Sequence, residues 1–148
     1  MIKEEFMRTA VENAKKAAEA GEVPVGAVIV KENKIIAEGY NKREMKQNAL
    51  SHAETEAINA ACEALSSWRL DGCTMYVTLE PCPMCTGAIM ASRIDRVVFG
   101  AYDEKGGAMG SVCDLCDMPF MSKPQVIGGF MEKECADVLT RFFGSIRG

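Results

Sequence analysis

The chain has 148 residues, of which 48% are hydrophobic and 26% charged, a composition typical of one globular domain and not of a disordered or fibrous protein. The formal net charge of −4 argues against a protein that coats nucleic acid by bulk electrostatic attraction. No run of residues reaches the roughly 18 apolar positions that a membrane-spanning helix needs.

The cysteine count points to the compartment. There are seven cysteines, an odd number, and the N-terminal 20 residues carry charges throughout, so we expect neither a signal peptide nor a disulfide framework. This pattern predicts a cytoplasmic protein whose thiols are core residues, metal ligands or nucleophiles.

The N-terminal part of the chain predicts a helix followed by a β-hairpin. Apolar residues recur at helical spacing over Ile2–Ala20, and Gly21 can end that helix. Val25–Lys31 and Lys34–Tyr40 are separated by a two-residue turn and predict two antiparallel strands. We expect the polar stretch Asn41–Leu50 to be a loop.

The middle of the chain alternates helices and strands. Ser51 precedes a helical run over residues 53–65, and Ser51 and Glu54 have the spacing of a capping box. Thr74–Leu79 predicts a buried strand, and Pro83 suits the first turn of a helix that ends near Ala91.

The remaining elements complete an α/β pattern. Arg96–Ala101 predicts a strand, Asp103–Gly110 a glycine-rich loop, Ser111–Cys116 a short helix, Gln125–Phe130 a weak strand, and Glu132–Ile146 an amphipathic helix. Strands that alternate with helices favour parallel pairing, whereas the hairpin adds an antiparallel part. We therefore expect a three-layer α/β/α domain over residues 1–148 with one mixed five-stranded sheet.

Two short motifs carry the chemistry. The first is His52-Ala53-Glu54, and the second is the segment PCPMC at residues 81–85. Each lies where a predicted helix begins, which is where open α/β sheets place their sites. The 26 residues between Glu54 and Pro81 suffice for one helix and one strand, so the two motifs can meet at one edge of the sheet.

These residue types predict a catalytic zinc site. Cys82 and Cys85 are three residues apart, so both sulfurs can point from one face of a first helical turn, whose positive end favours thiolates. His52 is the only histidine and would be the third ligand. Three protein ligands leave a fourth position open for water, which is the catalytic pattern, and Glu54 can then act as a proton shuttle if His52 lies outside the regular helix.

Cys113 and Cys116 form a second Cys-x-x-Cys pair. One interpretation joins them to Cys82 and Cys85 in a closed four-cysteine structural site. We favour the other, in which they pack as small apolar side chains, because the first leaves His52 and Glu54 unexplained.

Almost the whole chain resembles the bacterial tRNA-specific adenosine deaminases of the cytidine deaminase superfamily. The order H-x-E and then P-C-x-x-C is the signature of zinc nucleobase deaminases. The longer matching stretches are GEVPVGAVIV, SHAETEAI, SWRL, MYVTLEPCPMCTGAIMASRI, RVVFGAYDEKGGAMGS and ECADVLTRFF.

The resemblance implies a fold, a reaction and a set of site residues. The fold would be cytidine deaminase-like, and the reaction would convert adenosine to inosine at the wobble position of a tRNA anticodon. Zinc would be held by His52, Cys82 and Cys85, with Glu54 as proton shuttle, and the enzyme would work as a homodimer that grips the anticodon arm. Further residues match family positions that contact or surround the substrate: Asn41 (base contact), Val25 and Ala27 (pocket wall), and Asp103 and Lys105 (near the RNA backbone).

One region departs from the family pattern. Residues 113–124 contain no histidine and only one basic residue, Lys123, where relatives usually have several. From Ala101 to the C-terminus there are five basic and seven acidic residues, so the expected RNA contacts are fewer. Lys42, Arg43 and Lys46 could compensate from the other side of the pocket.

Two alternatives remain open. A zinc deaminase of a free nucleobase or nucleoside, such as guanine or cytosine, would keep every catalytic residue and explain the missing basic residues. A non-catalytic, zinc-stabilised subunit that binds RNA or a partner would have no use for Glu54.

Overall fold

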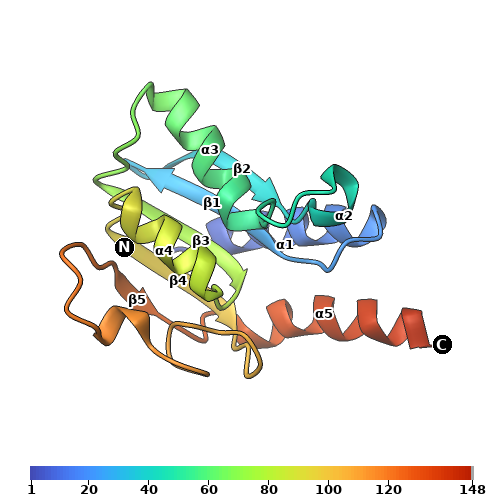
Figure 1. Cartoon of the computed structure of the whole chain (residues 1–148). Coiled ribbons are helices and arrows are strands. Elements are labelled where there is room, and N and C mark those ends of the chain that lie inside the picture. Colours follow the sequence, from blue (N-terminus) through green and yellow to red (C-terminus); the bar gives the residue numbers. More distant parts are fainter. Residues whose placement is uncertain (148) are drawn as a thin grey trace.

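A five-stranded mixed sheet forms the centre of the computed structural model, which describes residues 1–147 (Figure 1). The strands lie in the order β2-β1-β3-β4-β5; β1 is antiparallel to β2 and β3, whereas β4 is parallel to β3 and β5. The predicted mixed sheet with a parallel later half is therefore confirmed. The strands are β1 (Gly26–Lys31), β2 (Lys34–Tyr40), β3 (Cys73–Leu79), β4 (Arg96–Ala101) and β5 (Gln125–Ile127).

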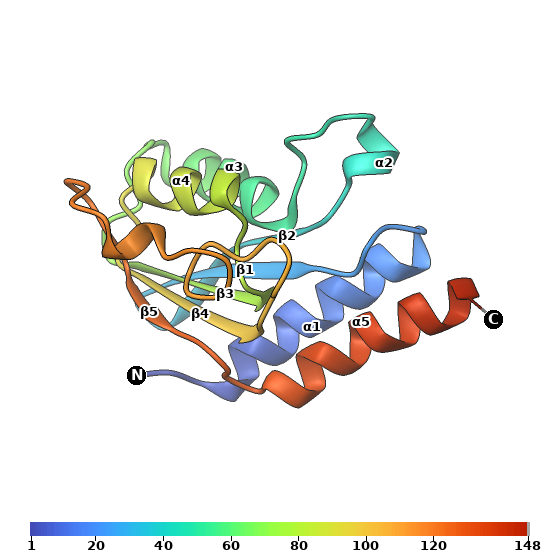
Figure 2. The same cartoon turned by 60° about the horizontal axis from the view of Figure 1, so that its bottom comes forward.

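Helices cover both faces of the sheet, which confirms the three-layer arrangement (Figure 2). Two of them, α1 and α5, lie side by side on one face, and α3 and α4 lie on the other. None of the helices in residues 1–147 combines the length and apolar character needed to cross a bilayer. The helices are α1 (Glu4–Glu19), α2 (Arg43–Lys46), α3 (Ala53–Leu65), α4 (Pro83–Ala91) and α5 (Glu132–Arg147), with one 3-10 turn, η1 (Leu115–Asp117).

Strand β1 is buried on both faces because helices cover both. Ala27 and Ile29 point into the core layer beneath α3 and α4, whereas Val28 and Val30 point into the layer beneath α1 and α5. This alternation follows from the two-residue period of a strand. The continuous apolar run in β1 is therefore typical of a central strand.

Gly39 in β2 sets the position of α3. A Cβ atom on Gly39 would lie 2.6 Å from both the carbonyl oxygen of Ala53 and the backbone nitrogen of Ala57. Only glycine allows the first turns of α3 to approach β2 this closely. Since His52 directly precedes α3, this contact also fixes one end of the candidate site.

The predicted capping box of Ser51 and Glu54 is wrong. Helix α3 begins at Ala53, and the residue before it, His52, has extended backbone (φ −86°, ψ 164°). The hydroxyl of Thr55 accepts the backbone N–H of His52 at 3.0 Å, so Thr55 caps the helix start. The side chain of Glu54 therefore does not take part in capping, and it lies buried in the first turn of α3.

The predicted loop Asn41–Leu50 contains a short helix that the sequence did not reveal. The buried carboxylate of Glu22 accepts the backbone N–H groups of Glu44 at 3.0 Å and Met45 at 2.6 Å. A carboxylate there satisfies amide groups at the start of α2 and interacts favourably with the helix dipole. A partner 22 residues away in the sequence thus orders this segment.

Two predicted elements near the C-terminus are shorter than expected. The short helix predicted over Ser111–Cys116 is instead η1, and the side chain of Asp114 caps it by accepting the N–H of Cys116 at 3.0 Å. Strand β5 ends at Ile127 and not at Phe130, because Gly128 packs directly against the ring of Phe99 and Gly129 has φ +79°. That backbone ends the regular ladder, although the N–H of Phe130 still donates to the carbonyl of Phe99 in β4 at 3.1 Å.

Candidate active site

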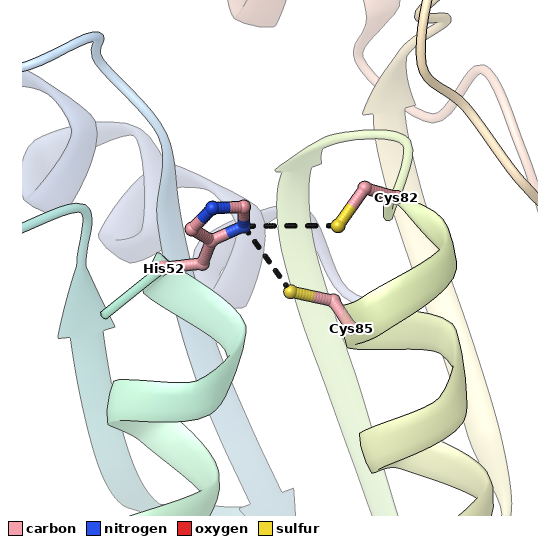
Figure 3. A group of neighbouring side chains, drawn as sticks. All are labelled: His52, Cys82 and Cys85. Carbon is pink, nitrogen blue, oxygen red and sulfur yellow. Dashed lines mark hydrogen bonds between the residues drawn. The ribbon is translucent and has the colours of Figure 1, made fainter. Parts of the chain in front are cut away.

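His52, Cys82 and Cys85 meet at the end of the sheet where β3 finishes, and Figure 3 shows the three side chains pointing toward one another. The Nδ1 atom of His52 lies 3.4 Å from the sulfur of Cys85 and 3.7 Å from the sulfur of Cys82. Within residues 1–146 this is the one group of three or more His, Cys, Asp or Glu side chains whose ligand atoms come close enough to hold a metal.

The local sequence explains how the two cysteines converge. Cys82 precedes α4 with extended backbone (φ −75°, ψ 174°), and Pro83 is the first residue of the helix. Proline has no N–H group to lose there, and its fixed φ favours the first helical position. The N–H of Thr86 donates to the carbonyl of Cys82 at 2.9 Å, so Cys82 and Cys85 flank the same first turn.

The donor set and its spacing fit zinc. A sulfur about 2.3 Å and a nitrogen about 2.05 Å from one tetrahedral ion are separated by about 3.6 Å. The two observed sulfur–nitrogen distances, 3.4 and 3.7 Å, lie on either side of that value. Two sulfurs and one imidazole nitrogen are ligands that Zn²⁺ prefers, and three of them leave one tetrahedral position open.

The two thiols differ in acidity. A hydrogen bond from the Cys85 thiol, with a further contribution from His52, lowers the pKa of Cys82 to about 4. The same contact, together with burial, raises the pKa of Cys85. The pair therefore carries one negative charge without a metal, and binding of a dication would displace the remaining proton.

Glu54 is the buried carboxyl group that lies beside the zinc-ligand residues. Its side chain is 4% exposed and lies on the cavity wall beside His52 and Cys82. Burial raises the pKa of Glu54 to about 7. A carboxyl group that exchanges protons near neutral pH is suited to general acid–base work.

A cavity of about 210 Å³ opens in front of this cluster. Three of the residues that the family resemblance assigned to substrate lie on its wall, namely Val25, Asn41 and Asp103. The other two do not. Ala27 is fully buried in the core layer beneath α3 and α4, and Lys105 is exposed in the loop beyond Asp103.

The amide of Asn41 is held in a defined orientation. Its Nδ2 group donates to the carbonyl of Val23 at 3.1 Å, and its Oδ1 atom accepts the N–H of Arg43 at 3.1 Å. An asparagine amide has two N–H groups and two lone pairs, so one of each is free for a ligand in the cavity. Asn41 also ties the start of α2 to the cavity rim.

The cavity wall also contains Arg43, which the sequence offered as a compensating RNA contact, and four residues that it did not single out as substrate contacts: Val23, Ala53, Leu79 and Glu80. Of these, Glu80 could have been identified from the sequence, because a charged residue stands there directly between the predicted buried strand and the zinc-ligand motif. Although burial alone would raise its pKa, hydrogen bonds from Ser111, Asp103 and Met109 hold the pKa of Glu80 below its usual value. Glu80 is therefore an ionised carboxylate within the protein.

The remaining cysteines do not join the cluster. Cys113 is exposed and Cys116 is partly buried against the core layer beneath α3 and α4, so only Cys116 fits the favoured packing interpretation. Cys73 and Cys135 are buried and Cys62 is partly buried in the core, as expected for packing residues.

Comparisons with known proteins agree with this geometry. Residues 1–145 match a family model described as MafB19-like deaminase. The chain is 49% identical over 143 residues to the tRNA-specific adenosine deaminase of Bacillus subtilis (strain 168). The alignment covers 96% of this chain and 89% of that protein.

Solved structures show the same fold. The chain aligns with a structure from a study of A-to-I editing by tRNA:A34 deaminases at the wobble position of transfer RNA, with a TM-score of 0.89 and 42% identity over 93% of this chain and 100% of that one. It also aligns, with a TM-score of 0.67 and 34% identity, with a guanine deaminase from Bacillus subtilis over 100% of this chain and 96% of that one.

The cytidine deaminase-like fold expected from the sequence is thus confirmed. Three observations lead to one assignment. They are a relative that is nearly half identical over almost the whole chain, the shared fold, and the His-Cys-Cys cluster. The chain belongs to the family of tRNA-specific adenosine deaminases, enzymes that act on a C–N bond.

Proposed function

We propose that this protein is a zinc-dependent hydrolase that converts adenosine to inosine at the wobble position of tRNA. The observation that carries the proposal is the buried carboxyl group of Glu54 beside the cluster of His52, Cys82 and Cys85. A closed structural zinc site has four protein ligands and needs no neighbouring acid or base. Three ligands with a buried carboxyl group are suited to hydrolysis.

His52, Cys82 and Cys85 would hold the metal. When bound, zinc lowers the pKa of a water molecule from 15.7 to about 7, so that a hydroxide nucleophile is available at neutral pH. Glu54 takes the proton of the attacking water and delivers it to N1 of adenosine as the C6–O bond forms. Glu54 then carries the proton of the new C6 hydroxyl to the amino group, the C6–N bond breaks as the C6 carbonyl forms, and ammonia leaves.

The cavity suits one flat base. Its volume of about 210 Å³ is smaller than the roughly 300–1,000 Å³ of pockets that enclose drug-sized ligands, so the rest of the substrate would remain outside. Asn41 offers one free N–H group and one free lone pair toward the base, and Val25 offers an apolar wall. A wobble base in a single-stranded loop can enter at a lower unstacking cost than a base in a duplex.

Contacts to RNA would lie at the rim. All three basic residues after Asn41 contact a carboxylate: Lys42 and Lys46 contact Glu56 at 3.9 and 3.0 Å, and Arg43 contacts Glu44 at 3.7 Å. Of the three, Arg43 is the one that lines the cavity. Arg43 is thus the member of this run best placed to meet a backbone phosphate. Asp103 also lines the cavity wall and Lys105 is exposed in the same loop, which supports a place for both near the RNA backbone.

A second candidate function is deamination of a free nucleobase or nucleoside. The scarcity of basic residues in 113–124 and the likeness to a guanine deaminase favour it. Against it, identity and TM-score are both higher for the tRNA deaminase structure than for the guanine deaminase. We therefore place it second.

We also propose that residues 1–148 form a single deaminase domain that works as a cytoplasmic homodimer. Helix α4 supports the dimer, because it contains no charged residue and yet exposes Pro83, Gly87 and Ala91 along one side. An uncharged, partly exposed helix face is typical of a surface that a partner covers.

The test is inosine formation by purified protein on an arginine anticodon stem-loop with a wobble adenosine, with Glu54→Ala as control. Rapid conversion that depends on Glu54 supports the proposal. No conversion by a zinc-loaded protein would overturn it, and ammonia release from a panel of free bases and nucleosides would then test the second candidate.

A further inference from the structure

The carboxylate of Glu80 organises the loop over residues 102–111. Glu80 is the residue after β3, is 2% exposed, and precedes the zinc-ligand segment by one residue. Its Oε1 atom accepts the N–H of Asp103 at 3.1 Å and the hydroxyl of Ser111. Its Oε2 atom accepts the N–H groups of Met109 and Ser111, each at 3.0 Å. Both ends of the loop therefore bind one carboxylate.

The loop is closely fitted around this group. A Cβ atom on Gly107 would lie 2.3–2.6 Å from the carboxylate atoms of Glu80, so no other residue fits there without displacing them. The backbone N–H of Ala108 donates to the carbonyl of Pro81 at 2.9 Å. The loop is thus attached both to Glu80 and to the turn that leads into Cys82.

Glu80 has no cationic partner, since no lysine, arginine or histidine in residues 1–146 lies within 4.0 Å of it. Its charge is balanced by backbone and hydroxyl donors of the loop alone. A buried carboxylate that loses such donors pays a large desolvation penalty, so loop and carboxylate keep one arrangement. The loop carries Asp103, which lines the cavity.

We propose that Glu80 is a positioning residue for substrate binding, holding Asp103 at the cavity rim in fixed register with the Cys82 turn. Although Glu80 itself lines the cavity, the four hydrogen bonds of its carboxylate all go to the loop, so we assign it a role through the loop and not on the reacting atoms. The inference rests on the proposed function, because it assigns substrate contact to the rim that Asp103 forms. It predicts that substrate affinity depends on the Glu80 carboxylate even when the metal site is intact.

Glu80→Gln is the main variant. The amide has nearly the same shape but places an NH₂ group against N–H donors of the loop, so the loop loses its single arrangement. On the anticodon stem-loop we expect KM to rise about tenfold while kcat stays within about threefold and zinc stays near one per chain, the pattern of lost uniform binding. A purely structural role would instead lower kcat, zinc content and thermal stability together and leave the KM of the active fraction unchanged.

A double-mutant cycle tests whether Glu80 acts through Asp103. If it does, Glu80→Gln combined with Asp103→Ala raises KM no further than Asp103→Ala alone. Glu22→Gln is the matched control, because Glu22 is also a buried carboxylate that accepts two backbone N–H groups, but those of α2 on the other side of the cavity. Its effect should add to that of Asp103→Ala.

Additive effects of Glu80→Gln and Asp103→Ala would overturn the proposal. If Glu80→Gln does not fold, Ser111→Ala removes only the hydroxyl donor and should still raise KM with kcat unchanged; unchanged KM there overturns the proposal equally. Failure of the proposed function gives a different result, since the unsubstituted protein would then form no inosine.

Discussion

His52 and Glu54 are two residues apart, yet both side chains face the same cavity. Within a regular helix such neighbours point to different faces. Here His52 lies outside α3 with extended backbone, and Glu54 lies inside its first turn. Because the helix begins between the two residues, the imidazole of His52 and the carboxyl group of Glu54 can both face the cavity.

Glu54→Gln should preserve the fold and zinc content and reduce kcat by about 10²–10⁴-fold, the range that one positioned acid or base contributes. Glutamine keeps the shape of the side chain but cannot shuttle a proton. Single-turnover inosine formation with metal analysis of the same sample measures this. Residual activity within tenfold of the unsubstituted protein would rule out the shuttle.

The two Cys-x-x-Cys pairs should differ in metal binding. Cys85→Ala removes a buried sulfur 3.4 Å from His52 Nδ1 and should lower zinc well below one per chain. Cys113→Ala is the matched control in the second pair, and it should leave zinc at one per chain because Cys113 is exposed and outside the cluster. Zinc loss in Cys113→Ala would revive the four-cysteine site.

Asn41→Ala should weaken both folding and substrate binding. It removes two hydrogen bonds of a side chain only 8% exposed, to Val23 and Arg43, at a cost of about 1–3 kcal/mol in unfolding free energy. KM should rise because the variant loses the amide that we propose contacts the base and also the hydrogen bond that positions the backbone of Arg43. Asn48→Ala is the control: Asn48 lies in the same segment and is exposed, and its side chain accepts the N–H of Leu50 at 2.9 Å without lining the cavity. Equal KM in the two variants would contradict a substrate role for Asn41.

Thiol reactivity should follow burial. Burial raises the pKa of Cys135 to about 12, so raising the pH from 7 to 9 leaves it almost wholly protonated, and iodoacetamide should not label it in the folded protein. In the zinc-loaded protein, where the metal would protect Cys82 and Cys85, the exposed Cys113 should be alkylated first. Mass spectrometry of timed samples, with urea-unfolded protein as reference, distinguishes the sites. Labelling of Cys135 at the rate of Cys113 would contradict the packing of α5 on the sheet.

Gly87→Glu should yield a monomer if α4 forms the dimer contact. A Cβ atom at Gly87 would meet nothing within 4 Å beyond its own helix, so the monomer can accept a glutamate there. In the dimer the same glutamate would be buried against an apolar surface of the partner, which is costly for a charged group. Gly144→Glu in α5 is the control, because it also has open space and lies on an exposed helix position. Sedimentation that shows the same oligomeric state for both variants would exclude this face.

The sequence alone predicted the elements whose pattern is local. The apolar alternation of β1, the buried run of β3 and the helical spacing of α1 each depend on neighbours within a few residues, so their type could be read directly. The metal donors were equally clear, because His52 is the single imidazole and the Cys82–Cys85 pair begins at a proline-marked helix. The family likeness covered the same stretches.

Tertiary structure decided what depends on distant partners. Helix α2 exists because Glu22, 22 residues before Glu44, satisfies its amides, and the 102–111 loop is ordered by Glu80, 31 residues before Ser111. Val25 lies just before β1 and lines the cavity, whereas Ala27 lies inside β1 and is buried in the core. The two residues differ because helices cover both faces of β1 from its first residues onward. Buried carboxylates must find donors wherever the folded chain brings them, and no local pattern encodes that pairing.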